Sequence, residues 1–349
     1  MSLSIRSMCS RSAPMLLALC FALHSAPAIA KTPPAEVASL LERLPKDVGA
    51  LAGFDSSRAR GTAAMKEGLR MARKDARAAR VLRMLERDFG FDLARHLDYV
   101  VAATPKFAGR PKASAPFSMV LKGTFDAEKI DALLQDASRA KPETIGGKKV
   151  HYVKRASVRA RLVDPSTLVL VRGPSSWQKQ AWKAALSKPS KRAKGPMADP
   201  LVSRLIGSVD TTQHAWGVAD TSALDQGSAP RTREVVSSLN FSRGVSMTTV
   251  MLMASAADAS TVLRKLEENR LYGAMLAAAY AAQPLVTNLV ARAASSTLTL
   301  TTSMTENELR AMGRRLREIE AERRRIKAAK QADTERDGAT PKAPKPSSE

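Results

Sequence analysis

Few side chains in this sequence have the types and spacing that catalysis or metal binding requires. Beyond residue 30 the histidines are His96, His151 and His214, and none is followed three or four residues later by His, Asp or Glu. That spacing would place two metal ligands on one face of a helix. We therefore predict no metal and no cofactor, and we expect each histidine to form local hydrogen bonds.

Nucleophile and phosphate-binding motifs are also missing. Ser246 follows Gly244 at the right distance, but Thr248 stands where a nucleophile elbow has its second glycine. The Gly146-Gly147 pair is typical of a turn, and neither common glycine-rich phosphate-binding pattern occurs in the chain. We therefore assign no catalytic residue and favour a protein that is not an enzyme.

An acidic pair leaves an enzymatic alternative open. Asp55 and Asp220 each follow a predicted strand, at matching places in the two halves of the chain. With His214 they could serve an envelope hydrolase whose dispersed catalytic residues gather in a cleft between the halves. Helix capping explains both aspartates more simply, because an Asp side chain accepts hydrogen bonds from the first turn of a helix.

Positive charge is the most conspicuous chemical property of the chain. It has 56 Lys and Arg against 33 Asp and Glu, a formal net charge of +23, which favours anionic partners such as envelope polymers or lipid headgroups. Two predicted helices carry the candidate anion-binding residues Arg70, Arg73, Lys74, Arg77, Arg80, Arg314, Arg315, Arg317, Arg323, Arg324 and Arg325. Alternatively, the charge is only compositional and serves solubility. Nucleic acid is disfavoured as a partner, because aromatic residues for base stacking are not interleaved with the basic ones.

The first 30 residues have the three parts of a secretory signal. Arg6 and Arg11 form a positive start, residues 15–23 form an apolar core too short to span a bilayer, and small residues stand at 28 and 30. We expect cleavage after Ala30 and export to the periplasm or the exterior. An uncleaved anchor is the alternative.

Both cysteines, Cys9 and Cys20, lie inside this segment, so we expect the exported chain to form no disulfide. Lipidation at Cys20 is a further alternative. It is disfavoured because Leu19 is bulkier than the small residue that a lipoprotein signal places before its cysteine.

An internal repeat predicts the fold. Residues 117–135 return as residues 249–266: in each, an apolar run reaches a polar break and a helical period begins. Flanking segments also correspond, namely 52–56 with 217–221 and 166–170 with 296–300. We predict an α+β fold of two related halves, each an antiparallel sheet with helices packed on one face. A single sheet shared by both halves is the alternative.

The periodicities define the elements and the boundaries between segments. Strands are predicted at 48–54, 99–104, 117–125, 149–153, 158–163, 167–171, 214–219, 235–241, 245–253, 289–293 and 297–301, and helices at 37–44, 63–89, 126–137, 174–186, 201–206, 258–282 and 306–330. The segments are a signal (1–30), a first α+β half (31–186), a Pro- and Lys-rich linker (187–200), a second half (201–304), a basic C-terminal helix (305–330) and a disordered tail (331–349).

The C-terminal helix has an apolar stripe at spacings of three and four that is interrupted by Arg323. The stripe consists of Leu309, Met312, Leu316, Ile319 and Ile326. We expect the helix to pack on the body as far as Ile319 and to project into solvent beyond it. A coiled-coil dimer and docking on an anionic surface are the alternatives.

Two apolar features are assigned to the core. Residues 271–291 carry no charge, which suits a membrane helix, but Pro284 and the polar residues around it favour a buried helix that breaks there. Trp177 and Trp182 could form a platform for sugars, yet the alanines beside them favour a core position, and Trp216 lies in an apolar strand.

The segments from Gly90 to Val101 and from Leu121 to Asp126 resemble those of exported, uncharacterised proteins of Gram-negative bacteria, notably myxobacteria. The resemblance covers roughly residues 45–315 and implies a signal peptide and two α+β halves. The basic helix from Arg58 to Arg87 and the Arg-rich C-terminal end depart from it. The resemblance implies no catalytic residues.

Overall fold

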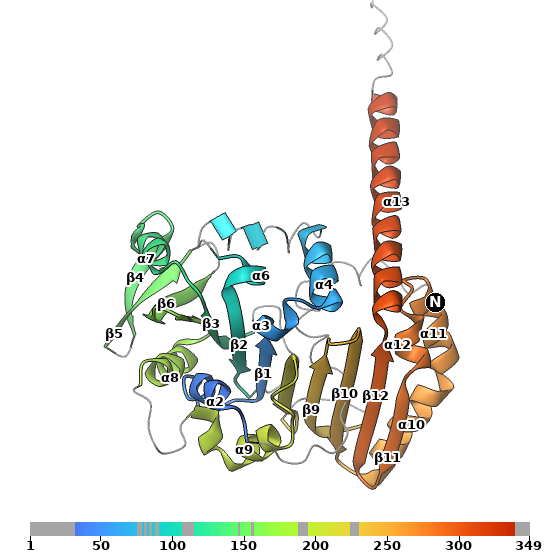
Figure 1. Ribbon diagram of the computed structural model, residues 1–349, viewed down its shortest axis with the longest axis horizontal. Helices are drawn as coiled ribbons and strands as arrows, with labels where there is room; N and C mark the ends of the chain where they lie inside the picture. Colours follow the sequence, from blue (N-terminus) through green and yellow to red (C-terminus); the bar gives the residue numbers. More distant parts are fainter. Residues whose placement is uncertain are drawn as a thin grey trace, which may run out of the picture.

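The structure is a computed structural model. It describes residues 32–338 apart from 75–78, 80–81, 84–85, 88–90, 107–114, 146, 155–156, 188–194 and 224–229. The predicted signal therefore lies outside the described residues, as do residues 339–349. The described chain is an α+β fold built on one sheet of 12 strands (Figure 1).

Every pair of neighbouring strands in this sheet is antiparallel. The order is β11-β12-β10-β9-β8-β1-β2-β3-β7-β6-β5-β4. The bounds are β1 Ala50–Asp55, β2 Leu97–Thr104, β3 Phe117–Gly123, β4 Ala140–Ile145, β5 Lys148–Val153, β6 Val158–Asp164, β7 Thr167–Arg172, β8 Ala215–Asp220, β9 Thr232–Asn240, β10 Val245–Met253, β11 Val290–Ala294 and β12 Thr297–Met304. A strand lies at each predicted position, and β4 is an addition.

The two halves share this sheet rather than having one sheet each. β1, the first strand of the first half, pairs with β8, the first strand of the second, so that the halves meet edge to edge. Ala52 lies opposite Gly217, and these residues begin the two segments that the sequence matches to each other. The alternative of a shared sheet is therefore the observed one.

The strand order of one half is repeated in the other. Counting outward from the junction, the first half reads β1-β2-β3-β7-β6 and the second reads β8-β9-β10-β12-β11. Helix α7 (Ala127–Gln135) follows β3, and α10 (Ala256–Glu268) follows β10. The segments 117–135 and 249–266 thus hold corresponding places in the topology.

One face of the sheet is covered by three helices near the junction. They are α2 (Ala35–Leu41), α8 (Ser175–Ala185) and α9 (Pro200–Gly207). The largest core cluster lies between them and the sheet, and it includes Val101, Val120 and Trp216 from the strands. Alternate residues of β2 are buried, as expected for a strand that packs one face on helices.

The opposite face carries α7 and α10, which corrects the prediction that helices lie on one face only. In β3, Val120 belongs to the core under α8 whereas its neighbour Leu121 packs under α7. In β10, Met251 packs under α10, while its neighbour Val250 pairs with Val236 of the first core. Because successive residues of a strand point to opposite faces, α7 and α10 share a face.

The uncharged segment 271–291 is broken rather than buried as one helix. It contains α11 (Arg270–Ala278), α12 (Gln283–Thr287) with Pro284 in its first turn, and the start of β11. Of α11, only Ala274 is buried, so the prediction of a buried helix is wrong for these residues. Within the described residues, no helix is long and apolar enough to cross a membrane.

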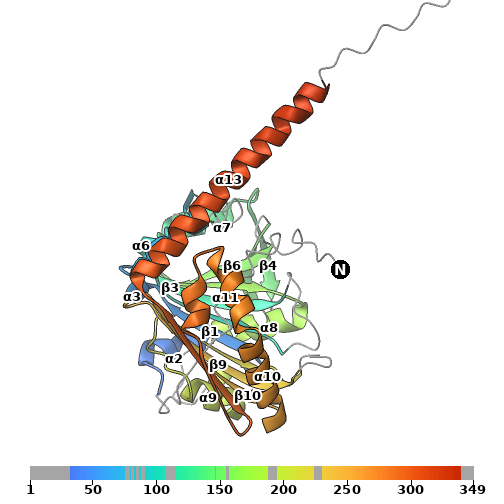
Figure 2. The ribbon, with the colours of Figure 1, turned by 90° about the vertical axis from the view of Figure 1, so that its right-hand side faces the viewer.

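The C-terminal helix α13 runs from Glu306 to Gly338 and projects far beyond the body (Figures 1 and 2). It therefore continues past residue 330, where we predicted that the tail would begin. Its first turns pack against α4 (Ala63–Lys74), which is the first part of the basic helix predicted at 63–89. Several residues between 75 and 90 lie outside the described residues.

Three short elements complete the described chain. Helices α3 (Ser56–Ala59) and α6 (Leu93–His96) flank the strands β1 and β2, and a turn of 3-10 helix spans Gly195–Ala198. This last turn lies inside the predicted linker and contacts α2 and α9, with Pro196 buried. The end of the predicted linker is therefore part of the packed body.

Candidate functional site

The contact between α4 and α13 is held by a buried carboxylate. The side chain of Glu67 is 7% exposed, and it pairs with Arg70 of the same helix and with Arg317 of α13, whose Nη1 lies 3.0 Å from Oε1. Gly313 makes this approach possible, because a Cβ at that position would collide with the Glu67 carboxylate. Partial desolvation at the helix contact, together with the positive charge of Arg317, lowers the pKa of the exposed Arg70 from its ordinary value.

Arg70 and Arg317 were predicted to bind external anions, but in the structure both pair with the Glu67 carboxylate of the same chain. Among the other predicted cations, Arg73 and Lys74 are exposed on α4, and Arg314, Arg315 and Arg325 are exposed on α13. The side chains of Arg323 and Arg324 lie outside the described residues, as do Arg77 and Arg80 entirely. The structure thus brings cations from two distant parts of the sequence onto a pair of packed helices.

A capping box fixes the start of α13. The Glu308 carboxylate accepts hydrogen bonds from the Thr305 N–H at 2.7 Å and its hydroxyl at 2.8 Å, and the Glu308 N–H donates to the Thr305 hydroxyl at 3.3 Å. Leu309 and Gly313 are buried, whereas Ile326 is 50% exposed. The helix is therefore anchored at its base and free of the body further on, as the apolar stripe predicts.

Asp55 and Asp220 do not come together. In the antiparallel pair of β1 and β8, Ala50 lies opposite Ala219, so the two aspartates stand at opposite ends of the strand pair. Six residues of strand separate these ends, which is about 20 Å at the usual rise per residue. The acidic pair imagined in a cleft between the halves is not formed.

Each aspartate has a local structural role instead. Asp55 is the N-cap of α3 and accepts a hydrogen bond from the Arg58 N–H at 2.9 Å. Asp220 accepts from the N–H of Ser222 at 3.0 Å. Burial alone would raise the pKa of the Asp220 carboxyl, but its hydrogen bonds from Ser222 and the nearby Lys106 together lower it. Asp220 is therefore held as an anion, which makes it a poor general base.

The three predicted histidines form hydrogen bonds with backbone groups, but the prediction of local bonding holds only for His96, since the partners of His151 and His214 lie 17 and 27 residues away. His96 Nδ1 accepts from the N–H of Asp92 at 3.1 Å, and His214 Nδ1 accepts from the N–H of Phe241 at 3.1 Å. Burial lowers the pKa of His214. The residues that the structure describes contain no cluster of three His, Cys, Asp or Glu that could hold a metal ion.

The tryptophans belong to the core. Trp177 and Trp182 are 4% and 1% exposed and pack with α8 against the sheet. Trp216 of β8 donates a hydrogen bond from its indole N–H to the hydroxyl of Tyr99 at 2.7 Å. Because Tyr99 lies in β2, this buried bond joins the two halves, and the predicted core positions are confirmed.

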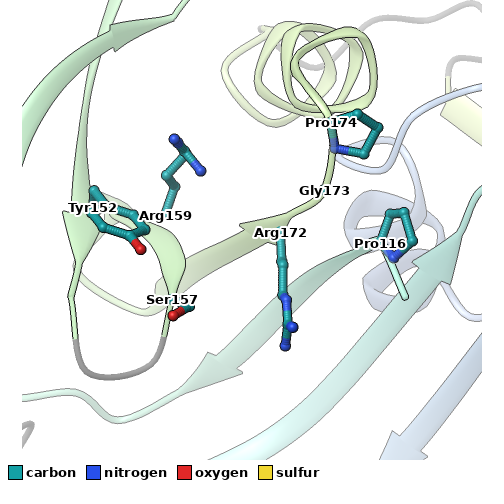
Figure 3. A pocket seen from close by; sticks show the side chains of 7 residues that line it. All are labelled: Pro116, Tyr152, Ser157, Arg159, Arg172, Gly173 and Pro174. Carbon is teal, nitrogen blue, oxygen red and sulfur yellow. The ribbon is translucent and has the colours of Figure 1, made fainter. Parts of the chain in front are cut away.

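A shallow pocket of about 350 Å³ opens beside the end of β7 (Figure 3). Arg159 lies 5.1 Å from the Tyr152 ring centroid and pairs with Glu143 at 2.8 Å. Arg159 lies opposite Val171 in the sheet, so the next residue, Arg172, points to the other face. The two guanidinium groups therefore do not converge on one ligand, and nothing in the sequence had indicated this pocket.

Comparisons with known proteins find similarity in structure only. No protein-family model matches the sequence, and no curated protein matches it. Crystal form III of TP0453 is similar with a TM-score of 0.45 and 10% identity over 78% of this chain and 96% of that chain. Crystal form I of TP0453 gives the same TM-score and identity over 78% and 95%.

The predicted site residues fall into two groups in the structure. Those of the predicted anion-binding residues that are exposed lie on α4 and α13, although other lysines and arginines are exposed elsewhere, while the acidic and histidine candidates are engaged in caps, turns and backbone hydrogen bonds. Sequence reasoning missed Glu67, because its partner Arg317 is 250 residues away. It also missed the exposed apolar side of α11, since hydropathy does not say which side of a helix meets the sheet.

Proposed function

We propose that this chain is an exported, non-enzymatic protein of the cell envelope or periplasm that binds an anionic envelope component. The cations of α4 and α13 supply the binding surface. The observation that carries this proposal is the packing of α4 on the base of a projecting α13, with Arg73, Lys74 and Arg314 exposed around the contact. The secretory signal in the sequence supports export.

Phosphate is the chemical group that such a surface suits best. Arginine binds phosphate and carboxylate oxygens with two parallel N–H donors, and exposed arginines attract polyanions over about 10 Å at moderate salt. The internal pairs of α13, such as Arg310 with Glu306 and Arg315 with Glu318, are exposed and individually weak. A polyanion can therefore compete for these arginines at little energetic cost.

The test is capture of the purified chain on lipopolysaccharide and on anionic vesicles at increasing salt. We expect binding to weaken steeply between about 0.1 M and about 1 M salt, where the screening length shortens to about 3 Å. The variant Arg73→Glu/Arg314→Glu should bind at least about tenfold more weakly than the wild type. Salt-insensitive capture, or no capture, would sink the proposal.

A matched control removes charge at the far edge of the sheet. Lys148 and Lys149 are exposed at the β4–β5 hairpin, away from α13 (Figure 1). The variant Lys148→Glu/Lys149→Glu changes the net charge by the same amount as Arg73→Glu/Arg314→Glu. It should retain most of the binding; an equal loss would mean that net charge alone, and not the α4–α13 surface, is responsible.

We also propose that the two halves descend from an internal duplication. The repeated strand order and the pairing of Ala52 with Gly217 support it, because a two-fold relation between the halves would pair equivalent residues at its axis. The test is to superpose β1–β3 on β8–β10 in an experimental structure. If the best superposition does not align residues 52–56 with 217–221, the duplication is contradicted.

A further inference from the structure

Helix α11 turns its small residues toward the body and its large apolar residues toward solvent. Ala274 is buried and Gly273 lies against Val286, so the inner side carries almost no side-chain bulk. The outer side carries large apolar residues, and their exposures are 86% for Leu271, 59% for Tyr272, 63% for Met275, 52% for Leu276 and 43% for Tyr280. Within the described residues, most of the exposed large apolar side chains belong to this one segment.

These side chains form a continuous surface. Residues four apart lie above one another on a helix, so Leu271 and Met275 form one row and Tyr272 and Leu276 form the next, with Tyr280 just beyond the helix end. We call these five residues the α11 patch. Figure 2 shows α11 on the face of the molecule turned toward the viewer, beside α10 and to the right of the start of α13. Contiguous exposed apolar surface of this kind marks an interaction site.

Cations border the α11 patch. Arg270 is exposed at the start of the helix, and Arg315 reaches its end, where its Nε donates to the Ala279 carbonyl at 3.1 Å. Arg314 is exposed beside it. The sequence contains no Asp or Glu from Asn269 to Thr305, although Glu267 and Glu268 precede this stretch on α10.

An apolar centre with two tyrosines and a cationic rim matches the interface of an anionic lipid bilayer. Aliphatic side chains enter the acyl boundary, tyrosines place an apolar ring below a polar hydroxyl, and arginines meet headgroup phosphates. The nine residues of α11 span about 14 Å, so the helix would lie in the interface plane rather than cross it. A second copy of the chain fits less well, because a two-fold contact would set one arginine rim against another.

We propose that the α11 patch docks the protein on anionic membranes by shallow insertion of its apolar side chains. The inference rests on the proposed function in one respect: headgroup attraction for the cations of α13 brings the patch to the surface. It adds that the partner is a lipid bilayer, and that α11 is the element that enters it. With both contributions, vesicle binding should weaken at high salt but keep a residual part that comes from the inserted apolar side chains, because insertion resists salt.

The experiment uses chain purified after export, with its N-terminus determined, and vesicles of phosphatidylglycerol and phosphatidylethanolamine. The fraction of protein that floats with the vesicles gives the partition coefficient. Leu271→Ser/Met275→Ser should lower this coefficient at least about tenfold, because it removes two inserted apolar side chains. Ile326→Ser is the matched control, since Ile326 is 50% exposed but lies on the projecting part of α13. It should change partitioning by less than about twofold.

A second readout reports position directly. The natural tryptophans are buried, so Tyr272→Trp places a reporter in the patch and Ile326→Trp places one outside it. On anionic vesicles, emission of Tyr272→Trp should shift to the blue and be quenched by brominated acyl chains. Emission of Ile326→Trp should do neither. Equal quenching at both positions, or none at 272, would overturn the proposal.

The outcomes separate this inference from the proposed function. Vesicle binding that salt abolishes and Leu271→Ser/Met275→Ser leaves intact would overturn insertion while supporting electrostatic binding. Vesicle binding that survives salt and is lost in Leu271→Ser/Met275→Ser would support insertion and count against the electrostatic surface. If Leu271→Ser/Met275→Ser instead converts a dimer to a monomer, as measured by light scattering, the patch is a self-association surface and the proposal is wrong.

Discussion

Along the chain, the two halves place different structures between corresponding strands, which are β3 and β6 in the first half and β10 and β11 in the second. The first half inserts α7 and the hairpin β4–β5, and it buries the apolar residues of α7. The second half inserts α10, α11 and α12, and it leaves the large side chains of α11 in solvent. One insertion therefore extends the core, and the other presents apolar surface.

The helices α7 and α10 show where the halves diverge. The fourth residue of each helix after its N-cap is fully buried, and it is Ile130 in α7 but Ala259 in α10. Both helices are capped alike, by Asp126 and Ser255, whose side chains accept from the third residue of the helix. The same local signals thus start both helices, while the size of the buried residue differs.

Truncating apolar residues in α7 and in α11 should give the largest difference in the free energy of unfolding between the two halves. Ile130→Ala should lower the free energy of unfolding by about 2–5 kcal/mol, because it leaves a cavity in a closed core. Leu271→Ala should change it by less than about 0.5 kcal/mol, since the side chain is exposed. Urea unfolding of both variants measures the contrast. A comparable cost for Leu271→Ala would mean that α11 is covered in solution and would break the comparison.

The repeat made the strand positions predictable, while the edges and outer surfaces of the sheet were not. Strand β4 was missed because Ala140–Ile145 contains Pro142 and charged residues, a composition that only an edge strand accepts. The pairing of β1 with β8 could not be read from the sequence either, since each half is self-consistent without it. Similarly, Leu, Tyr and Met on α11 looked like core residues, because hydropathy does not say which side of a helix meets the sheet.

The site residues show the same division. Capping by Asp55 and the bond from the Asp92 N–H to His96 follow from short-range rules and were predictable, whereas His214 bonds to Phe241, 27 residues away. The fate of Arg70 and Arg317 was not, because whether a cation stays free depends on a carboxylate brought to it by the fold. Glu67 reaches Arg317 only after α4 and α13 have packed together.

A smaller change in the free energy of unfolding is expected from Tyr99, at the junction where the halves meet. Burial raises the pKa of Tyr99 to about 12, so the folded protein keeps this phenol protonated at pH values where the unfolded chain loses the proton. The contribution of Tyr99 to the free energy of unfolding is complete below pH of about 10 and is lost as pH rises toward about 12. The free energy of unfolding should therefore fall by up to about 3 kcal/mol over this range. Unfolding free energies measured from about pH 9 upward should show this decline.

The control for that decline is Tyr99→Phe. This variant removes the acceptor of the Trp216 indole N–H and should cost about 1–3 kcal/mol at neutral pH. It should also remove the Tyr99 contribution to the alkaline slope, leaving only the slope of the remaining tyrosines. If the slope is unchanged in Tyr99→Phe, the junction does not hold a protonated phenol.

The smallest expected change in the free energy of unfolding comes from replacing two helical glycines, one on each side of the α4–α13 contact. A Cβ at Gly68 of α4 would meet nothing within 4 Å, so Gly68→Ala should stabilise the protein by about 0.5–1 kcal/mol through helix propensity. Gly313→Ala has the same propensity gain, but its Cβ would collide with the Glu67 carboxylate that Arg317 holds. We therefore expect the opposite sign, with destabilisation and faster amide hydrogen exchange in the first turns of α13. Two stabilising substitutions would show that the base of α13 is not fixed on α4, and the cationic surface would then lack the rigid support that its proposed function requires.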